Sequence, residues 1–244
     1  IEDCAVSPAD LPNYIAEIQG LLAKHKVEAA YYAHAGAGEL HIEPFLDINS
    51  PEGKILFRTI LSETVDILKK YQGSLSGEHG DGRLRGEFIE KMMGKELLNL
   101  FKEIKHIFDP YQILNPGKIV NSPPMDEEFR ISNSDEYQIK SFFNYGDFEN
   151  PLRLAEKCSG SGDCKKTALS GGTMCPSYRV TRDEQHLTRG RVNTLRLALS
   201  GQLGKDALCG EEVQQAMDLC VGCKGCKRDC PTGVDMARMK IETT

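Results

Sequence analysis

The sequence predicts an α+β domain followed by a small, mainly helical domain rich in cysteine. Strand-like and helix-like apolar patterns are interspersed through residues 1–120, which favours an antiparallel or mixed sheet with helices on one face. Seven of the nine cysteines fall in two short groups after residue 157. We therefore expect one domain at 1–120 and a second at 151–244. The stretch 121–150 is acidic, polar and weakly periodic, and we interpret it as a linker.

Apolar periodicity places the first strands and the first helix. IEDCAV, VEAAYYA and LHIEPFLDI each predict a strand. SPADLPNYIAEIQGLLAKH predicts a helix with Ser7 as its N-cap and Pro8 at the first helical position. Four apolar residues at helical spacing mark its buried face: Leu11, Ile15, Ile18 and Leu22.

Further helices follow along the chain. One is expected at 54–71, ending before Gly73, and one at 87–108, interrupted near Gly94. DPYQILNPGKIV then leaves the helix through its prolines. In the cysteine-rich domain, short helices are expected at 188–200 and 211–219.

The overall composition excludes some classes of partner. The net charge of −6 gives no reason to expect nucleic acid, and no run of eighteen apolar residues indicates a transmembrane helix. Closely spaced cysteines suit metal or cluster binding better than disulfides, so we expect a reducing compartment. The cytoplasm is the expected location, with peripheral attachment to the inner membrane as an alternative. A chain that opens without Met, in an expected strand, indicates a piece of a longer protein.

The cysteine spacing predicts an iron–sulfur cluster. CVGCKGCKRDCPTG has the spacing C-x2-C-x2-C-x3-C-P, in which ferredoxins bind one cluster with the first three cysteines and reach a second with the fourth. This predicts one 4Fe-4S site and the beginning of another. The first set is Cys175, Cys220, Cys223 and Cys226, and the second is Cys158, Cys164 and Cys230. Structural zinc, in a non-catalytic interaction module, is the alternative, although zinc sites more often pair two separated C-x2-C knuckles.

The second cysteine set lacks one ligand. Ser161 stands where the regular spacing would place the middle cysteine. Three alternatives stay open: a three-iron cluster, recruitment of Cys209 or Ser161, or no second cluster. Four arginines near these groups either line a solvated helix face or offset the negative charge of a cluster: Arg182, Arg189, Arg191 and Arg196.

Two glycine-framed stretches predict a divalent metal site. HAGAGELH contains His34 and His41, and SGEHGDGRLRG contains Glu78 and His79. Two histidines and a carboxylate suit zinc, manganese or iron(II), and the glycines allow backbone and ligand to approach closely. Histidines on surface loops, without a ligand, are the alternative.

These motifs carry a resemblance to a known family. HAGAGELH, SGEHGDGRLRGEF and FDPYQILNPGKIV, in that order, resemble the C-terminal domain of FAD-linked oxidases of the vanillyl-alcohol-oxidase superfamily. That group includes D-lactate, glycolate and D-2-hydroxyglutarate dehydrogenases. The cysteine-rich tail resembles the ferredoxin-like iron–sulfur domain fused to large bacterial D-2-hydroxyglutarate dehydrogenases. The resemblance implies that 1–120 is part of a cap domain, and that FAD binds mostly to an N-terminal domain that this chain lacks.

The resemblance also implies roles for individual residues. His34, His41 and Glu78 match positions that bind a divalent metal such as zinc or manganese. His79 matches the catalytic histidine that handles the proton of the substrate hydroxyl. The remaining candidates are Asn115 near the flavin and Arg83 and Arg85 for a substrate carboxylate.

The implied function is oxidation of a 2-hydroxyacid by FAD, with electrons leaving through the cluster to a quinone or carrier protein. The isolated chain would be inactive. The alternative is a non-catalytic electron-transfer subunit that docks on a separate flavoprotein. Three positions depart from the motif that many relatives share: Ala37, Glu39 and Glu43. A glutamate at 43 would repel a second carboxylate, so the identity of the 2-hydroxyacid stays open.

Overall fold

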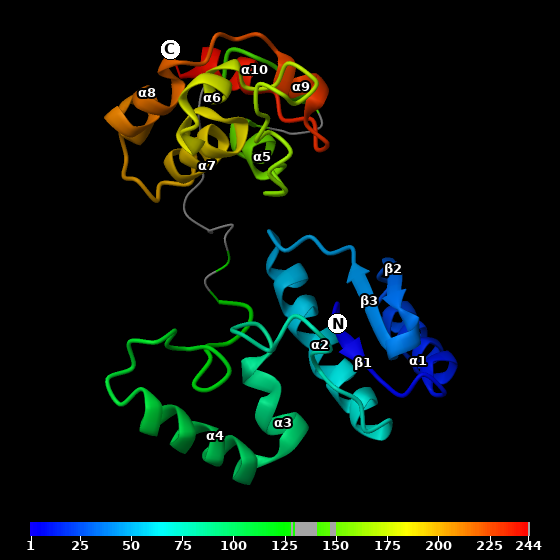
Figure 1. Cartoon of the computed structure of the whole chain (residues 1–244). Helices are drawn as coiled ribbons and strands as arrows, with labels where there is room; N and C mark the ends of the chain where they lie inside the picture. The colour runs from blue at the N-terminus through cyan, green and yellow to red at the C-terminus, as the bar shows by residue number, and fades with distance from the viewer. Residues whose placement is uncertain (128, 130–140, 147–149, 244) are drawn as a thin grey trace. The chain divides into compact units, whose positions relative to one another are not determined.

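The computed structural model describes residues 1–127, 129, 141–146 and 150–243 (Figure 1). The chain divides into two compact units, Ile1–Phe129 and Arg130–Thr244. The division falls within the stretch 121–150 that we interpreted as a linker, of which 128, 130–140 and 147–149 lie outside the described residues. Met125, near the start of that stretch, is buried in the core of the first unit.

The first unit is an α+β domain, as predicted. Its sheet has the order β1-β3-β2, and both neighbouring pairs are antiparallel. Its elements are β1 (Cys4–Ala5), α1 (Leu11–Lys24), β2 (Ala29–His34), η1 (Ala35–Ala37), β3 (Glu39–Pro44), α2 (Pro51–Lys70), η2 (Gly86–Phe88), α3 (Ile89–Met93) and α4 (Lys95–Phe108).

The alternation of side chains in β3 separates the core from the polar face of the sheet. Leu40 and Ile42 are buried with Ile18 of α1 and Leu68 of α2 in one hydrophobic cluster. Since successive side chains of a strand point to opposite faces, Glu39, His41 and Glu43 project from the other face. The fold therefore places a histidine and two carboxylates on the face of the sheet opposite the α1 and α2 core.

The first helix begins later than predicted. Ser7 and Pro8 lie in a turn, and α1 begins at Leu11, with Asp10 at the N-cap position. Pro12 explains the difference, because it has no N–H to donate and its ring would clash with the carbonyl four residues earlier in a helix that began at Pro8. Starting at Leu11 puts Pro12 in the first turn, where its missing N–H costs nothing.

The other helices of this unit follow the predicted pattern with shifted ends. Helix α2 begins at Pro51 rather than 54, because the Ser50 hydroxyl accepts a hydrogen bond from the Gly53 N–H at 3.0 Å. The predicted interruption at Gly94 is confirmed, since this residue has a φ of +90° between α3 and α4. DPYQILNPGKIV forms no helix or strand, also as predicted.

The second unit is small and mainly helical, and the helices predicted at 188–200 and 211–219 are confirmed as α7 and α8. Its elements are α5 (Pro151–Glu156), α6 (Pro176–Thr181), η4 (Glu184–His186), α7 (Thr188–Leu199), η5 (Ala207–Cys209), α8 (Glu211–Asp218), α9 (Gly225–Asp229) and α10 (Met236–Glu242). All nine cysteines of the chain are free thiols. Among the described residues, we find no helix with the length and apolar character needed to cross a bilayer.

A histidine–carboxylate cluster and a cysteine-lined cavity

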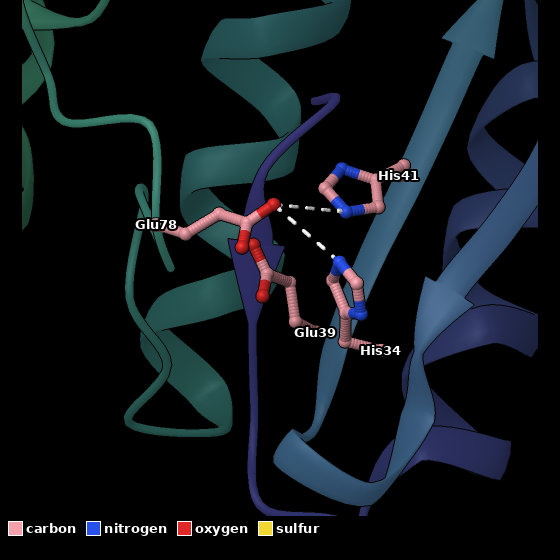
Figure 2. A group of neighbouring side chains, drawn as sticks. All are labelled: His34, Glu39, His41 and Glu78. Atoms are coloured by element: carbon pink, nitrogen blue, oxygen red, sulfur yellow. Dashed lines mark ion pairs between the residues drawn. The ribbon is translucent and has the colours of Figure 1, made fainter.

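Four side chains from three segments meet on the face of the sheet opposite helices α1 and α2 (Figure 2). His34 ends β2, Glu39 and His41 belong to β3, and Glu78 comes from the loop after α2. Each offers one ligand atom, and these four atoms lie within 4.8 Å of one another. Glu78 Oε1 is 3.5 Å from both His34 Nε2 and His41 Nε2. The structure thus brings together the three residues for which the sequence suggested metal binding.

The turn between the two histidines requires glycine. Gly38 has a φ of +79°, and a Cβ at this position would lie 1.8 Å from the Val6 carbonyl oxygen. The Val6 N–H donates to the Gly38 carbonyl at 2.9 Å. Glycine at this position therefore lets the turn pack directly on the segment after β1. The contact fixes the turn that joins the strands of His34 and His41.

Glu2 orients two imidazoles. His41 Nδ1 lies 3.1 Å from the Glu2 carbonyl oxygen, and His79 Nδ1 lies 3.2 Å from Glu2 Oε2. Because a carbonyl oxygen only accepts, His41 carries a proton on Nδ1, and its Nε2 faces Glu78. The bond to Glu2 raises the pKa of His41 against the effect of burial, and the nearby carboxylates raise it further.

His79 stands at the edge of this cluster. Its Nε2 lies 3.2 Å from Glu78 Oε1, and its ring stacks on that of His41 at 5.4 Å between centroids. The His79 side chain is 45% exposed, whereas that of His41 is 3% exposed. His79 is therefore the imidazole of this stacked pair that a bound molecule can reach.

Asp3 holds the loop that carries Glu78 and His79. Its buried carboxylate accepts hydrogen bonds from the Ser76 hydroxyl and, at 3.1 Å each, from the N–H groups of Glu78 and His79. Burial would raise the pKa of Asp3, but these hydrogen bonds outweigh it and hold the pKa well below its usual value. Glu39, when protonated, donates to the Asp3 carboxylate, and this bond raises the pKa of Glu39 together with burial and the charge of Glu78.

The donor set fits a divalent cation. Two imidazoles and two carboxylates are ligands that zinc, manganese and iron(II) all accept. Glu39 Oε1 is also buried and has no hydrogen-bond partner within the described ranges. An unsatisfied buried oxygen beside two imidazoles is consistent with a site for a cation.

The other candidates of the first unit lie apart from the four ligand atoms. Arg85 is buried, and its guanidinium lies 3.6 Å from Glu2 Oε2 while it borders an apolar cavity of about 300 Å³. Arg83 donates to the Glu127 carbonyl at 3.0 Å. Asn115 has a φ of +50° and lines a groove with Phe108 and other apolar residues of α4 and the loop after it.

Sequence reasoning missed Glu2 and Asp3. Both lie about 75 positions from the loop that they contact. Two adjacent acids directly before a strand were the available signal. The residues that these two acids contact cannot be identified until the fold brings the distant segments together.

In the second unit, Cys175, Cys220, Cys223 and Cys226 line one cavity together with Thr188 and Arg191. These are the four cysteines of the first predicted set. Four thiolates at about 2.3 Å from a zinc ion would stand roughly 3.8 Å apart. No three cysteine thiols in the described part of the chain lie within 4.8 Å of one another. The wider spacing favours a cluster over a single zinc ion.

Two helix ends direct N–H groups at these thiols. The Cys175 thiol accepts from the Thr188 N–H at 3.0 Å, at the start of α7. Burial raises the pKa of Cys175, and the bonds from Thr188 oppose that rise. Burial likewise raises the pKa of Cys226, opposed by the N–H groups of Met236 and Ala237 at the start of α10. Such donors stabilise the negative charge of a cluster.

The second cysteine set is partly assembled. Burial raises the pKa of Cys164, the Arg189 N–H opposes that rise, and the charge of Cys158 adds to it. The Cys230 thiol lies 3.3 Å from the Thr232 hydroxyl. The Ser161 hydroxyl donates to Asp163 at 2.8 Å, and Cys209 is exposed in η5.

Asp229 connects the two cysteine groups. Its Oδ2 accepts from the N–H groups of Thr173 and Met174 at 2.7 and 3.1 Å. These residues directly precede Cys175, and Asp229 directly precedes Cys230. The Thr173 bond is the largest of the effects that lower the pKa of Asp229 to about 2.

Comparison with known families finds one match in each unit of the chain. Residues 1–119 match the family "FAD linked oxidases, C-terminal domain", and residues 154–234 match the "4Fe-4S dicluster domain". Residues 1–119 therefore form the C-terminal domain of an FAD-linked oxidase, and residues 154–234 form a 4Fe-4S dicluster domain. The family resemblance predicted from the sequence is confirmed.

The individual relatives that the chain resembles are D-2-hydroxyglutarate and D-lactate dehydrogenases. The chain is 31% identical to the D-2-hydroxyglutarate dehydrogenase of Pantoea ananatis, over 97% of this chain and 26% of that protein. It is 30% identical to the Escherichia coli enzyme of the same name, over 98% of this chain and 27% of that protein. A D-lactate dehydrogenase of Archaeoglobus fulgidus is 34% identical over 48% of this chain and 26% of that protein. The chain thus spans about a quarter of the length of these relatives.

Proposed function

We propose that this chain forms the substrate side and the electron exit of an FAD-linked 2-hydroxyacid dehydrogenase. The observation that carries the proposal is the meeting of His34, His41, Glu78 and His79 in one cluster. The same chain holds a cavity lined by four cysteines. Such an enzyme needs a substrate site that supplies electrons to the flavin and a cluster that accepts them from it, and this chain offers candidates for both.

His34, His41 and Glu78 would hold the divalent cation, and His79 would act as the general base. When bound, the cation lowers the pKa of a coordinated hydroxyl and FAD accepts the hydride. Glu2 fixes the His79 ring through Nδ1, so Nε2 takes the proton of the substrate hydroxyl. The Glu2 carboxylate then stabilises the positive charge that His79 acquires.

The substrate carboxylate is assigned to the arginine side of the site. Arg85 borders a cavity that Glu2 also lines, so its guanidinium lies beside the residue that orients His79. Arg83, whose guanidinium is bonded to the Glu127 carbonyl, is the weaker candidate of the two.

Electrons would leave through the cysteine-rich unit. Cys175, Cys220, Cys223 and Cys226 would hold a 4Fe-4S cluster, and Cys158, Cys164 and Cys230 a second cluster. The dicluster family match supports the second site. The final acceptor is proposed to be a quinone or a carrier protein, and the cytoplasm the location.

An FAD-binding domain is the proposed partner of the first unit. Helix α4 and the loop after it expose a row of large apolar side chains, which we call the α4 face: Leu97, Leu100, Ile104, Ile107, Phe108, Tyr111, Ile113 and Leu114. Exposed apolar patches of this extent are uncommon on isolated domains. Asn115, the candidate flavin neighbour, directly follows this row. The relatives are about four times as long as this chain, which provides for such a domain.

A single substitution tests the catalytic role. Combined with an FAD-binding domain, His79→Gln is expected to slow flavin reduction by a 2-hydroxyacid about 10²- to 10⁴-fold, the usual contribution of a general base. Iron content should stay unchanged. Flavin reduction at the wild-type rate would favour the electron-transfer subunit instead, because that role does not involve His79.

A further inference from the structure

We propose that Glu39 is a fourth protein ligand of the divalent cation, which makes the site one of two histidines and two carboxylates. The inference deepens the proposed function and rests on the metal site described there. One carboxylate oxygen of Glu39 lies within 4.8 Å of the ligand atoms of His34, His41 and Glu78. Figure 2 shows the carboxyl groups of Glu39 and Glu78 turned toward each other.

The burial of Glu39 gives independent support. Glu39 is only 6% exposed, and its Oε1 is a buried acceptor with no hydrogen-bond partner in the residues that the structure describes. A buried oxygen without a partner destabilises the fold unless something coordinates it. The approach of Gly77 is close, since a Cβ there would lie 2.7 Å from Glu39 Oε1. The loop therefore encloses the carboxylate beside the two histidines rather than letting it reach solvent.

The charge around the site calls for a cation. Glu2, Asp3, Glu39 and Glu78 all border the cluster, and Arg85 is the cation that approaches Glu2 and Asp3. Uncompensated carboxylates at such separations repel one another. A divalent ion between Glu39 and Glu78 would replace that repulsion with two attractive contacts.

Four protein ligands restrict the kind of metal. A tetrahedral zinc ion would have no open position left, whereas catalytic zinc keeps one. Manganese(II) accepts carboxylate ligands and takes up to six, so positions would stay open for the hydroxyl and carboxylate of a substrate. We therefore assign a cation of the manganese type to this site.

The competing role for Glu39 is a buried acid that only bonds to Asp3. Glu39→Gln separates the two roles, because the glutamine amide keeps the size and a donor for Asp3 but supplies no negative oxygen to a cation. Glu39→Asn is a second variant, which also removes the negative charge and shortens the side chain by one methylene group. Glu28→Gln, at an exposed residue just before β2, is the matched control for the loss of one charge.

The experiment measures binding of Mn²⁺ to the metal-free chain in two ways. The electron paramagnetic resonance signal gives the concentration of free Mn²⁺, and the rise in melting temperature on adding the ion reports binding to the folded chain. Glu39→Gln and Glu39→Asn are expected to bind at least about tenfold more weakly, and Glu78→Gln likewise. Glu28→Gln should match the wild type. Circular dichroism of the metal-free variants verifies that each is folded.

Two results overturn the inference, and they can be told apart. If both Glu39 variants bind Mn²⁺ like the wild type while Glu78→Gln does not, Glu39 is only a partner of Asp3 and the three-ligand site survives. If the wild-type chain binds neither Mn²⁺ nor Zn²⁺ at the cluster, the proposed metal site itself is wrong.

Discussion

The chemistry available to each histidine depends on which ring nitrogen is already engaged. Glu2 uses its carbonyl on His41 and its carboxylate on His79, in both cases at Nδ1. Both Nε2 atoms consequently face Glu78, one from a buried ring and one from a half-exposed ring. Glu2 thus leaves Nε2 of each ring for the roles proposed above, His41 as a metal ligand and His79 as a base.

Glu43 is expected to select against substrates with two carboxylates. It is exposed on the face of β3 that carries His41, and it accepts a hydrogen bond at 3.1 Å from Tyr32, whose ring stacks on His41. A distal carboxylate near this position would be repelled. With an FAD-binding domain present, Glu43→Gln should raise kcat/KM for 2-hydroxyglutarate relative to lactate by about tenfold, the effect of one close like charge. An unchanged ratio would show that the distal carboxylate binds elsewhere.

Asp229 is expected to stabilise the cysteine-rich unit at neutral pH. Asp229→Asn should lower the melting temperature of the chain by several degrees and reduce the iron retained, because it weakens the bonds to Thr173 and Met174. The folded pKa of about 2 lies below the unfolded value of about 3.9. The contribution of Asp229 to the free energy of unfolding is therefore complete above about pH 4 and is lost as the pH falls toward 2.

The control for Asp229 is Asp206→Asn, which removes an exposed carboxylate in the same unit. Melting curves at pH 7 and at pH 3 should show a difference from the wild type that is largest at pH 7. If Asp229→Asn and Asp206→Asn melted together at pH 7, Asp229 would not connect the two cysteine groups in solution.

Among the elements that the structure describes, helix α4 leaves most of its apolar face uncovered. Only Leu98 of α4 is buried, in a small cluster with Ile89 and Val120 and beside the half-buried Phe101. Ile104 and Phe108 are 53% and 80% exposed. A helix with so little of its apolar surface buried depends on a partner for that face.

Substitution on the α4 face should therefore affect association rather than folding. Phe108→Ser is expected to leave the melting temperature of the chain unchanged and to weaken binding to an FAD-binding domain at least about tenfold. Glu103→Ser, on the polar side of the same helix, should bind normally. If the chain alone formed a dimer that Phe108→Ser dissociated, a second copy and not the flavin domain would be the occupant.

The elements also show where sequence reasoning was sufficient. Local signals identified the break at Gly94, helices α7 and α8, and the two strands that carry His34 and His41. The start of α1 was wrong because Ser7 and Pro8 form a convincing cap locally, and Pro12 excludes that helix only once its ring is placed against residue 8. Glu2, Asp3 and the enclosure of Glu39 depend on contacts between distant segments, which no local pattern encodes.

For the whole molecule, the proposed division of roles, with the substrate side in the first unit and electron transfer in the second, predicts how the purified chain behaves. Prepared without oxygen, the 244-residue chain should contain iron and inorganic sulfide in equal amounts. It should show no turnover of 2-hydroxyacids until an FAD-binding domain is added, because hydride transfer needs the flavin. Iron and sulfide analysis and a dye-reduction assay check the two halves of the prediction.

Either half can fail by itself. Zinc without iron or sulfide would exclude the electron-transfer role of the second unit. Turnover of a 2-hydroxyacid by the chain alone would contradict the assignment of the flavin to a partner domain.

The first turn of α7 has a consequence for the energetics of electron flow. The N–H groups of Thr188 and Arg189 are consecutive, yet one approaches Cys175 and the other Cys164, which belong to different proposed clusters. A hydrogen bond to a cluster sulfur stabilises the reduced form and raises its midpoint potential. A displacement of α7 along its axis would therefore lengthen or shorten both hydrogen bonds together and move the midpoint potentials of both proposed clusters in the same direction.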